Sequence, residues 1–540
     1  MHWSSVFISA ELLKFSIASL QQPLTAETNQ LQTPFDDVFD NKVEWALDHF
    51  HIPGVGIAVV RDNEVFTKGY GLSDIEASKS VTGHTLFFAG STSKAHTAAA
   101  ISLLIDDDVN YPDVQWNTPV HSLLPRDFSL SDTWSTAHTT IIDMLSHRSG
   151  LPRHDWVWKA NLTLQEIVQS MRHLPLTAAP RTQWQYCNLM YSTAAHLIET
   201  KTNQSLYSFL SQNLWGPLNI SETYLSLSHA QDAEKDIAQG YSLDFNGELI
   251  PTNKVYLEAI RGAGNVLTSA ADYSKWMSAI LHQRLPISNE SYAMLLGAQS
   301  IIRSNTVEPF QSPELYGLGW ILQTYGGQSL VSHNGAQYGY GASVVLVPSR
   351  KFGVAILGNN MIGTNAASDF LTYHLIDKEL GIPAKKRFDW VSRADAMINQ
   401  TNLPDNIVSI LYPAIPDPPL PSPRDFSAYE GIYHHPAYPD LNISSDCPKR
   451  SSPVPPSLNK TLPGLCGSVV NGNEYSNDEV FDFYHITSTF WVKMANFWDL
   501  STASRVEFHL SSDGSVDLMG IEVDDAMTAK GEKIWWKRAT

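Results

Sequence analysis

Apolar positions along the first part of the chain follow two different periods. From Phe35 to His51 they recur at helical spacing, which predicts an amphipathic helix. The next two apolar runs, 54–60 and 65–71, are joined by a short polar turn, and this pattern predicts a β-hairpin. Strand-like runs resume much later, and a helical pattern closes the region; these stretches are 319–322, 342–347, 352–357 and, for the helix, 366–380.

The pattern between about 94 and 281 is mainly helical, interrupted by polar loops. Strands from both ends of the region can therefore pair in one sheet, with the helices inserted between them. The predicted fold class is α+β: an antiparallel sheet flanked by helices, with a helical lobe beside it.

Beyond this region the composition changes. Residues 412–423 are rich in proline, which is typical of a semi-rigid linker. Short strand-like runs follow from Asp425, with Asp513-Gly514 as a hairpin turn, and predict a small all-β barrel domain. The predicted segments are an N-terminal arm or degenerate signal sequence (1–35), the α+β domain (36–385), a Pro-rich linker (386–424) and the barrel (425–540).

Composition excludes several classes of function. The net charge of −19 argues against a nucleic-acid partner, because phosphate binding requires clustered Lys and Arg. Three cysteines are too few for a disulfide scaffold or a four-thiolate zinc site. The sequence contains no apolar run of about twenty residues, so we expect no membrane span. It does not predict an oligomeric state.

The compartment, secreted or cytoplasmic, stays open at this stage. The stretch 6–20 is partly apolar, but Glu11 and Lys14 interrupt it and no basic residue precedes it. Cys447 and Cys466 flank a loop that a disulfide could close in an oxidising compartment. Several Asn-x-Ser/Thr sequons also favour secretion; they begin at Asn161, Asn203, Asn219, Asn289, Asn399, Asn442 and Asn459.

The main candidate for chemistry is the sequence Ser91-Thr-Ser-Lys94. Gly90 precedes it and an apolar helical run follows, so Ser91 lies at a helix start with Lys94 one turn later on the same face. An adjacent amine can activate a serine, and backbone N–H groups can stabilise an oxyanion. Taken alone, the motif is common and favours a simpler interpretation, a serine helix cap followed by a solvated lysine.

Two further sequence elements favour the interpretation of Ser91 as a serine activated by Lys94. Tyr186 and Asn188 lie just before a helical run and supply a proton acceptor and an amide. His333, Gly335 and Ala336 lie in the later strand region, where a small residue lets an edge strand approach a substrate through its backbone.

With this order of elements, residues 36–385 resemble the serine β-lactamases and penicillin-binding proteins, in particular the class C, esterase and D-aminopeptidase types. The segments 144–151, 261–269 and 316–320 resemble further motifs of that family. The C-terminal domain resembles the lipocalin-like barrel that some D-peptidases carry.

The resemblance implies a role for each matching residue. Ser91 would attack an acyl carbonyl, Lys94 would share the serine proton, and Tyr186 would be the general base. Asn188 would orient Lys94 and the substrate amide. The N–H groups of Ser91 and Ala336 would form an oxyanion hole.

His333 departs from the family pattern, which commonly has lysine there. An unperturbed histidine is mostly neutral above about pH 6.5, so it offers little charge to a substrate carboxylate. A neutral imidazole could still donate a hydrogen bond to Tyr186 or to a substrate carbonyl. The resemblance therefore implies weak recognition of free carboxylates.

Other chemistry-bearing residues are interpreted as structural. His147 and His154 lie in a loop without the partners of a metal site, and Cys187 is interpreted as a packing residue. The sequence has no phosphate- or dinucleotide-binding fingerprint, so neither a metal nor a cofactor is expected.

The predicted function is a serine hydrolase or acyltransferase that forms an acyl-enzyme with an ester or amide. Esterase, D-peptidase and natural-product acyl-transfer activities all fit, with a small molecule or a peptide as the substrate. The alternative is a catalytically inactive binding protein of the same fold, against which the intact Ser91, Lys94 and Tyr186 argue.

Overall fold

The structure is a computed structural model that describes residues 33–244, 247–399, 403–447, 457–458, 464–472, 480–497 and 500–539. Residues 1–32, which include most of the predicted N-terminal arm, lie outside the described part, as does the sequon at Asn459. Residues 34–540 form one compact unit. Among the described helices, none is both long and apolar enough to cross a membrane.

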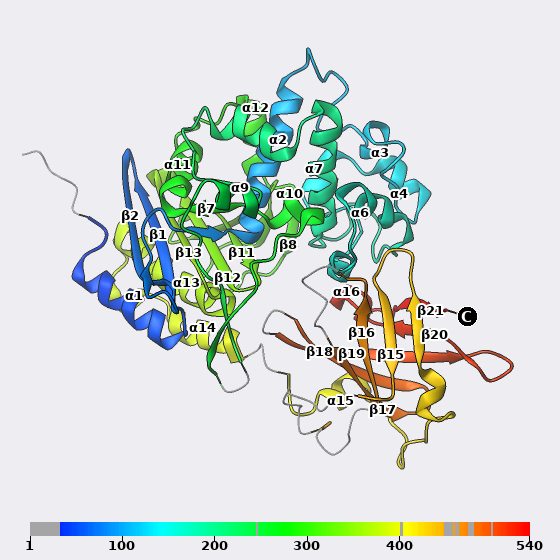
Figure 1. The fold of residues 1–540 in the computed structure, drawn as a ribbon. Coiled ribbons are helices and arrows are strands. Elements are labelled where there is room, and N and C mark those ends of the chain that lie inside the picture. The colour runs from blue at the N-terminus through cyan, green and yellow to red at the C-terminus, as the bar shows by residue number, and fades with distance from the viewer. Residues whose placement is uncertain are drawn as a thin grey trace, which may run out of the picture. The chain divides into compact units, whose positions relative to one another are not determined.

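The central feature is an antiparallel sheet built from both ends of the region, as the hydrophobic pattern predicted. β1 (Gly54–Arg61) pairs with β2 (Glu64–Asp74) in the predicted hairpin and, on its other side, with β13 (Phe352–Gly358) (Figure 1). The strand order is β3-β2-β1-β13-β12-β11-β10-β9-β8. The remaining strands are β3 (Lys79–Ser80), β8 (Ser300–Arg303), β9 (Glu314–Tyr316), β10 (Ile321–Tyr325), β11 (Gln328–Gln337) and β12 (Tyr340–Val347).

Both faces of the sheet are covered, which explains why its central strands are apolar at nearly every position. In β13, Val354 and Ile356 face one core while Ala355 and Leu357 face the other. Helices α1 (Asp37–His49) and α13 (Met361–Glu379) supply side chains to the first core. Helix α11 (Ala270–Leu281) packs on the second face, where the helical lobe begins.

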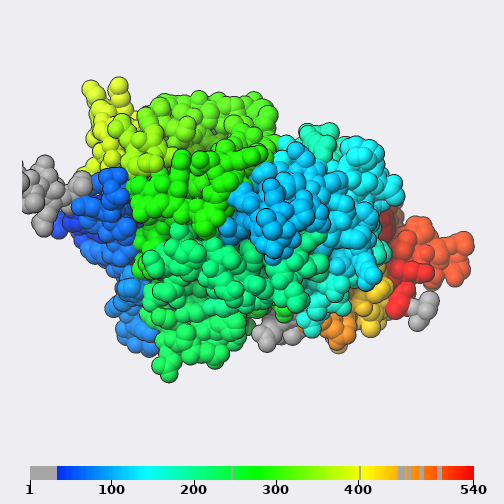
Figure 2. All heavy atoms as spheres, turned by 90° about the horizontal axis from the view of Figure 1, so that it is seen from above, coloured from blue at the N-terminus to red at the C-terminus, as the bar shows by residue number. Residues whose placement is uncertain are grey.

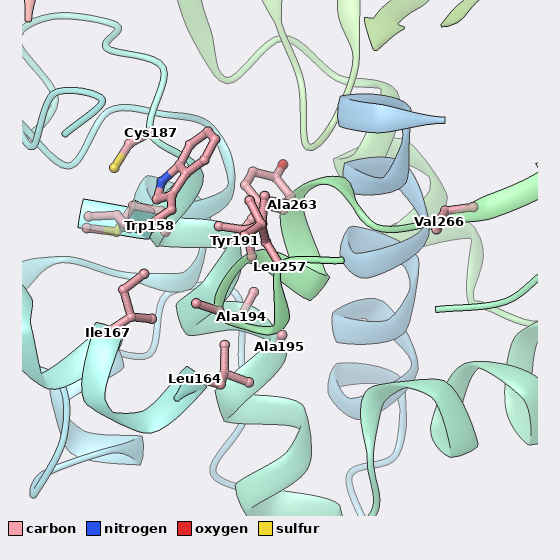
Figure 3. Packing of buried hydrophobic residues seen from close by; sticks show 14 of the residues in the cluster. Trp158, Leu164, Ile167, Cys187, Tyr191, Ala194, Ala195, Leu257, Ala263 and Val266 are labelled. Carbon is pink, nitrogen blue, oxygen red and sulfur yellow. The ribbon is translucent and has the colours of Figure 1, made fainter. Parts of the chain in front are cut away.

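The helical lobe is organised around α2 (Ser93–Asp106), a helix buried on almost every side. Helix α7 (Asn188–Thr202) and the short α10 (Arg261–Gly264) pack beside it, with Tyr191, Ala194 and Ala263 among the buried contacts (Figure 3). Viewed from above, the segments coloured cyan to green form a continuous surface over this lobe (Figure 2). Its other helices are α3 (Val120–Leu123), α4 (Thr133–His138), α5 (Ile141–Leu145), α6 (Leu164–Ser170), α8 (Leu206–Leu210), α9 (Leu227–Asp232) and α12 (Asn289–Leu296).

The predicted linker is only partly extended. Its first part forms α14 (Trp390–Asn399), and the Trp390 ring stacks on Tyr373 of α13 at a centroid distance of 4.0 Å. A short helix, α15 (Ile407–Leu411), follows, and the proline-rich stretch 412–423 has neither helix nor strand. The helices of this segment thus lie before the cluster of prolines that begins at Pro413, since proline prevents regular structure.

The C-terminal strands β14 to β21 close into an antiparallel barrel, as expected. Asp513-Gly514 lies in the turn between β19 and β20, with Gly514 at φ +83°, a conformation that glycine adopts without strain. Large aromatic side chains, among them Tyr429, Trp491 and Phe508, fill the interior, which is typical of a small barrel. The strands are β14 (Gly431–His434), β15 (Asp440–Ser444), β16 (Leu465–Val470), β17 (Val480–Thr487), β18 (Phe490–Phe497), β19 (Leu500–Leu510), β20 (Val516–Ile521) and β21 (Ile534–Arg538).

Cys447 and Cys466 form a disulfide in the barrel; their Cα atoms are 5.5 Å apart and their sequence separation is 19. The third cysteine, Cys187, is buried and not disulfide-bonded. We expect the double variant Cys447→Ser/Cys466→Ser to lose about 3 kcal/mol of unfolding free energy, because a closed loop of this length restricts the unfolded chain. Urea unfolding of oxidised protein and variant measures the difference, and equal midpoints would contradict the expectation.

Candidate active site

Ser91 lies in a 3₁₀ turn, Gly90–Thr92, that leads from β4 (Leu86–Phe88) into α2. Ser93 fixes this turn, because its hydroxyl donates to the Gly90 carbonyl at 2.6 Å and accepts from the Val266 N–H at 3.0 Å. Ser93 thus ties the turn to Val266, and the Ser91 side chain lines the pocket.

The Lys94 amine is buried and has three hydrogen-bond partners from three different elements. It contacts Ser91 Oγ at 3.1 Å, Asn188 Oδ1 at 2.7 Å and the Ala263 carbonyl at 2.9 Å. Burial lowers the pKa of Lys94 well below its ordinary value, and the nearby Arg153 guanidinium acts in the same direction. The solvated lysine considered above is thus excluded for this residue, whose side chain is fully buried.

Tyr186 closes the other side of Ser91. Its side chain interacts with Ser91, and its ring lies over the Lys94 amine, with Nζ 4.6 Å from the ring centroid. Burial raises the pKa of Tyr186, and the contacts with Ser91 and Arg153 only partly oppose this effect. At neutral pH the phenol therefore carries its proton.

Strand β11 brings its backbone against the Ser91 turn. A Cβ on Gly335 would lie 2.1 Å from the Ala89 carbonyl, and one on Gly90 would lie 2.5 Å from the Ala336 nitrogen. Only glycine fits at these two positions, as the sequence pattern suggested for Gly335.

The register of β11 directs the Ala336 N–H away from its neighbour strand. Gln337 and Tyr340 flank a two-residue hairpin turn and form a hydrogen-bonded pair, so the adjacent Ala336 lies in a non-hydrogen-bonded pair with Gly341. On the other side, β10 pairs with β11 only as far as Ser332. The edge beyond Ser332 is therefore open toward the pocket, which His333 and Ala336 line.

The hydrogen bonds of the His333 ring differ from those considered from the sequence. Its Nδ1 lies 2.6 Å from the Asn334 carbonyl, which can only accept, so this nitrogen carries the proton. Its Nε2 lies 3.1 Å from the Tyr316 hydroxyl and accepts from it. Neighbouring groups thus use both ring nitrogens, which leaves no ring N–H for Tyr186 or for a substrate carbonyl in this arrangement.

The protonation of His333 also differs from that of an exposed histidine. Burial, with the nearby Lys94 amine, lowers the pKa of His333 to about 3. The ring is thus neutral well below the pH at which an unperturbed histidine gains its proton.

Ser91, Tyr186, His333 and Ala336 line one pocket of about 440 Å³. Lys94 and Asn188 lie beneath it, joined to Ser91 by the hydrogen bonds above. The structure thus brings together the seven residues singled out by sequence, with Gly335 providing the close approach of β11.

Sequence reasoning missed a charged group at the pocket wall. The Arg153 guanidinium pairs with Asp155 at 2.6 Å and lies 4.9 Å from the Tyr186 ring centroid. The Asp155 carboxylate in turn accepts from Asn188 Nδ2 at 3.0 Å. The only local signal was an Arg and an Asp two positions apart after the motif 144–151.

Another part of the pocket wall, next to Arg153, comes from the barrel. Asp524, Asp525 and Ala526 line the pocket and lie at the start of α16 (Asp525–Thr528). Nothing in the local sequence marks these residues, because a contact across 371 positions brings them to the site.

The histidines interpreted as structural have structural contacts. His147 Nδ1 accepts from the Cys187 N–H at 3.1 Å, and His154 contacts Tyr438 and the Pro175 carbonyl. Burial raises the pKa of the Cys187 thiol to about 12, as fits a packing residue. Within the described ranges, no group of three or more His, Cys, Asp or Glu side chains is arranged to hold a metal ion.

Comparison with known proteins agrees with this arrangement. The family model described as Beta-lactamase matches residues 35–377, which include every residue of the site except those of the barrel. The chain belongs to the β-lactamase family. Its serine, lysine and tyrosine elements identify it as a serine hydrolase of that family.

Relatives at different distances extend the likeness. The unguisins hydrolase ungD' of Aspergillus campestris is 36% identical over 95% of this chain and 94% of its own, and ungD of Aspergillus violaceofuscus is 34% identical over 94% and 91%. Protein flp of Staphylococcus aureus is 25% identical over 71% of this chain and 72% of its own.

One solved structure shares the fold over nearly the whole chain. The octameric penicillin-binding protein homologue from Pyrococcus abyssi superposes with a TM-score of 0.59 at 19% identity. The match covers 90% of this chain and 98% of that one, so the likeness in fold extends to the barrel.

We expect the His333 ring to remain neutral between about pH 5 and pH 8, the range in which exposed histidines titrate. The physical reason is burial beside Lys94, which lowers the pKa of His333 to about 3. NMR spectra of histidine-labelled protein, assigned with a His333→Gln variant, measure this directly. A change in the chemical shifts of that ring near pH 6.5 would contradict the expectation, because it would show that His333 is accessible to water.

Proposed function

We propose that this hydrolase cleaves an amide or ester bond in a peptide-like natural product that has no free carboxylate next to the scissile bond. The observation that carries the proposal is the contact of Ser91 Oγ with the buried Lys94 amine and with Tyr186, at the wall of a pocket large enough for a small ligand.

The chemistry follows from the two pKa shifts. Because burial lowers the pKa of Lys94, its amine can take the Ser91 proton as Ser91 Oγ attacks the substrate carbonyl. Because burial raises the pKa of Tyr186, its hydroxyl is protonated and can deliver a proton to the leaving group. The N–H groups of Ser91 and Ala336 would stabilise the oxyanion.

Deacylation reverses these transfers. Water takes the place of the leaving group, gives a proton to Tyr186 and attacks the acyl-enzyme, and Ser91 recovers its proton from Lys94. Asn188, which accepts from the Lys94 amine, keeps that amine directed at Ser91 throughout.

The substrate class follows from charge. His333 is neutral, and Arg153, the cation among the described residues that line the pocket, is paired with Asp155. Asp524 and Asp525 add negative charge where the barrel lines the pocket. The pocket therefore disfavours a substrate with a free carboxylate. A cyclic peptide has no C-terminal carboxylate and avoids this cost. The relatives named as unguisins hydrolases support a natural-product substrate.

The Tyr186→Phe variant should lower kcat by about 10²- to 10⁴-fold, the usual worth of a proton-transfer group. Only a hydroxyl is lost, so the melting temperature should change little. The matched control is Tyr316→Phe, which removes a buried hydroxyl that contacts His333 but not Ser91. Comparable losses in both variants would move the proton-transfer role away from Tyr186.

The substrate class is tested with a cyclic peptide, its linear form with a free C-terminus, and benzylpenicillin. Mass spectrometry should detect addition of one water to the cyclic peptide in preference to the other two, and no product with Ser91→Ala. His333→Lys should raise the relative kcat/KM for penicillin by about 10- to 100-fold, since a hydrogen bond to a charged group is worth about 1.5–3 kcal/mol. A wild-type protein that prefers penicillin would overturn the proposed specificity.

A further inference from the structure

One short segment, 152–155, connects the catalytic centre to the barrel. On the barrel side, the Arg153 N–H donates to Asp524 Oδ2 at 3.1 Å, and Asp524 is also the N-cap of α16. The next residue, His154, contacts the Tyr438 hydroxyl at 2.6 Å. Two consecutive residues of this segment are therefore attached to the barrel.

The direction of the His154 contacts can be derived. Burial lowers the pKa of His154 to about 4, so the ring is neutral and has one proton. The Pro175 carbonyl, 3.0 Å from Nε2, can only accept, so Nε2 carries that proton. Nδ1 must then accept, and the Tyr438 hydroxyl is the donor.

The backbone at His154 needs such support. Its φ of +47° lies in the left-handed region, which a residue with a Cβ adopts only when its surroundings hold it there. The hydrogen bonds from Tyr438 and to Asp524 hold the residue and its neighbour in that conformation.

On the catalytic side, the same turn directs the flanking side chains at the reacting groups. Arg153 lies against the Tyr186 ring, and Asp155 accepts from Asn188 Nδ2. The second contact fixes the orientation of the amide, because it leaves Asn188 Oδ1 facing the Lys94 amine. The turn thus links the barrel to Tyr186 through Arg153, and to Lys94 through Asp155 and Asn188.

We propose that Tyr438 of the barrel is a positioning residue for the hydrolase reaction, acting through the turn 152–155 on Asn188 and Tyr186. The inference rests on the proposed function, because it concerns the groups that move protons there. Tyr438 is not among the residues that line the pocket, so it acts without touching the substrate.

The test compares two barrel tyrosines. Tyr438→Phe removes the hydroxyl that holds His154, whereas Tyr433→Phe removes an equally buried hydroxyl that donates to the Tyr429 carbonyl within the barrel, at 2.8 Å. With p-nitrophenyl acetate, Tyr438→Phe should lower kcat by about 10- to 100-fold, as small misplacements of catalytic groups do. KM should be nearly unchanged, and Tyr433→Phe should match wild type.

A second variant covers the case in which Tyr438→Phe does not fold. Asp524→Asn keeps an acceptor for the α16 cap but weakens the hold on the Arg153 N–H, and it should lower kcat in the same way. Labelling of Ser91 with a fluorophosphonate gives an independent rate and should fall with kcat.

The outcomes separate the two proposals. A wild-type protein that reacts neither with the ester nor with the fluorophosphonate would overturn the proposed function. If wild type reacts and folded Tyr438→Phe and Asp524→Asn react equally fast, the positioning role is wrong while the serine chemistry stands. A rise in KM at constant kcat would also contradict it, because that result indicates binding.

Discussion

The burial of one amine determines how this active site is built. An amine deprived of water must replace its hydration with hydrogen bonds, because a buried polar group without partners is costly. The three hydrogen-bond partners of Lys94 come from the turn at Ser91, from Asn188 at the start of α7 and from the Ala263 carbonyl in α10. These elements can meet only if α2 is surrounded closely, and its run of alanines, 98–100, permits that approach. The packing of the helical lobe therefore also determines where Ser91 lies.

Features encoded by neighbouring residues could be predicted from the sequence. The hairpin 54–71, the turn at Asp513-Gly514 and the serine at a helix start all depend on short spacings, and all three are present. Helix α14 was missed because its apolar residues precede a proline-rich stretch whose composition dominated the interpretation. Its burial against Tyr373 is a tertiary effect that a local pattern does not contain.

The electrostatics of the site could not be derived in the same way. The sequence identifies a histidine at position 333, but its pKa depends on burial and on Lys94, which lies far away along the chain. Likewise, Arg153 looks like a free cation in the sequence, and only the folded chain pairs it with Asp155. The residue types in the sequence indicate which chemical groups the site contains. The folded environment of each group determines whether it is charged and whether that charge is already paired.

The barrel changes how the catalytic domain should be understood. Aromatic side chains fill the interior of the closed barrel, and the start of its helix α16 contributes to the wall of the catalytic pocket. The buried amine itself draws all three of its hydrogen-bond partners from the helical lobe and the Ser91 turn. The barrel reaches it only through intermediate residues, because the turn 152–155 contacts Asp524 on one side and Asn188 on the other, and Asn188 accepts from Lys94.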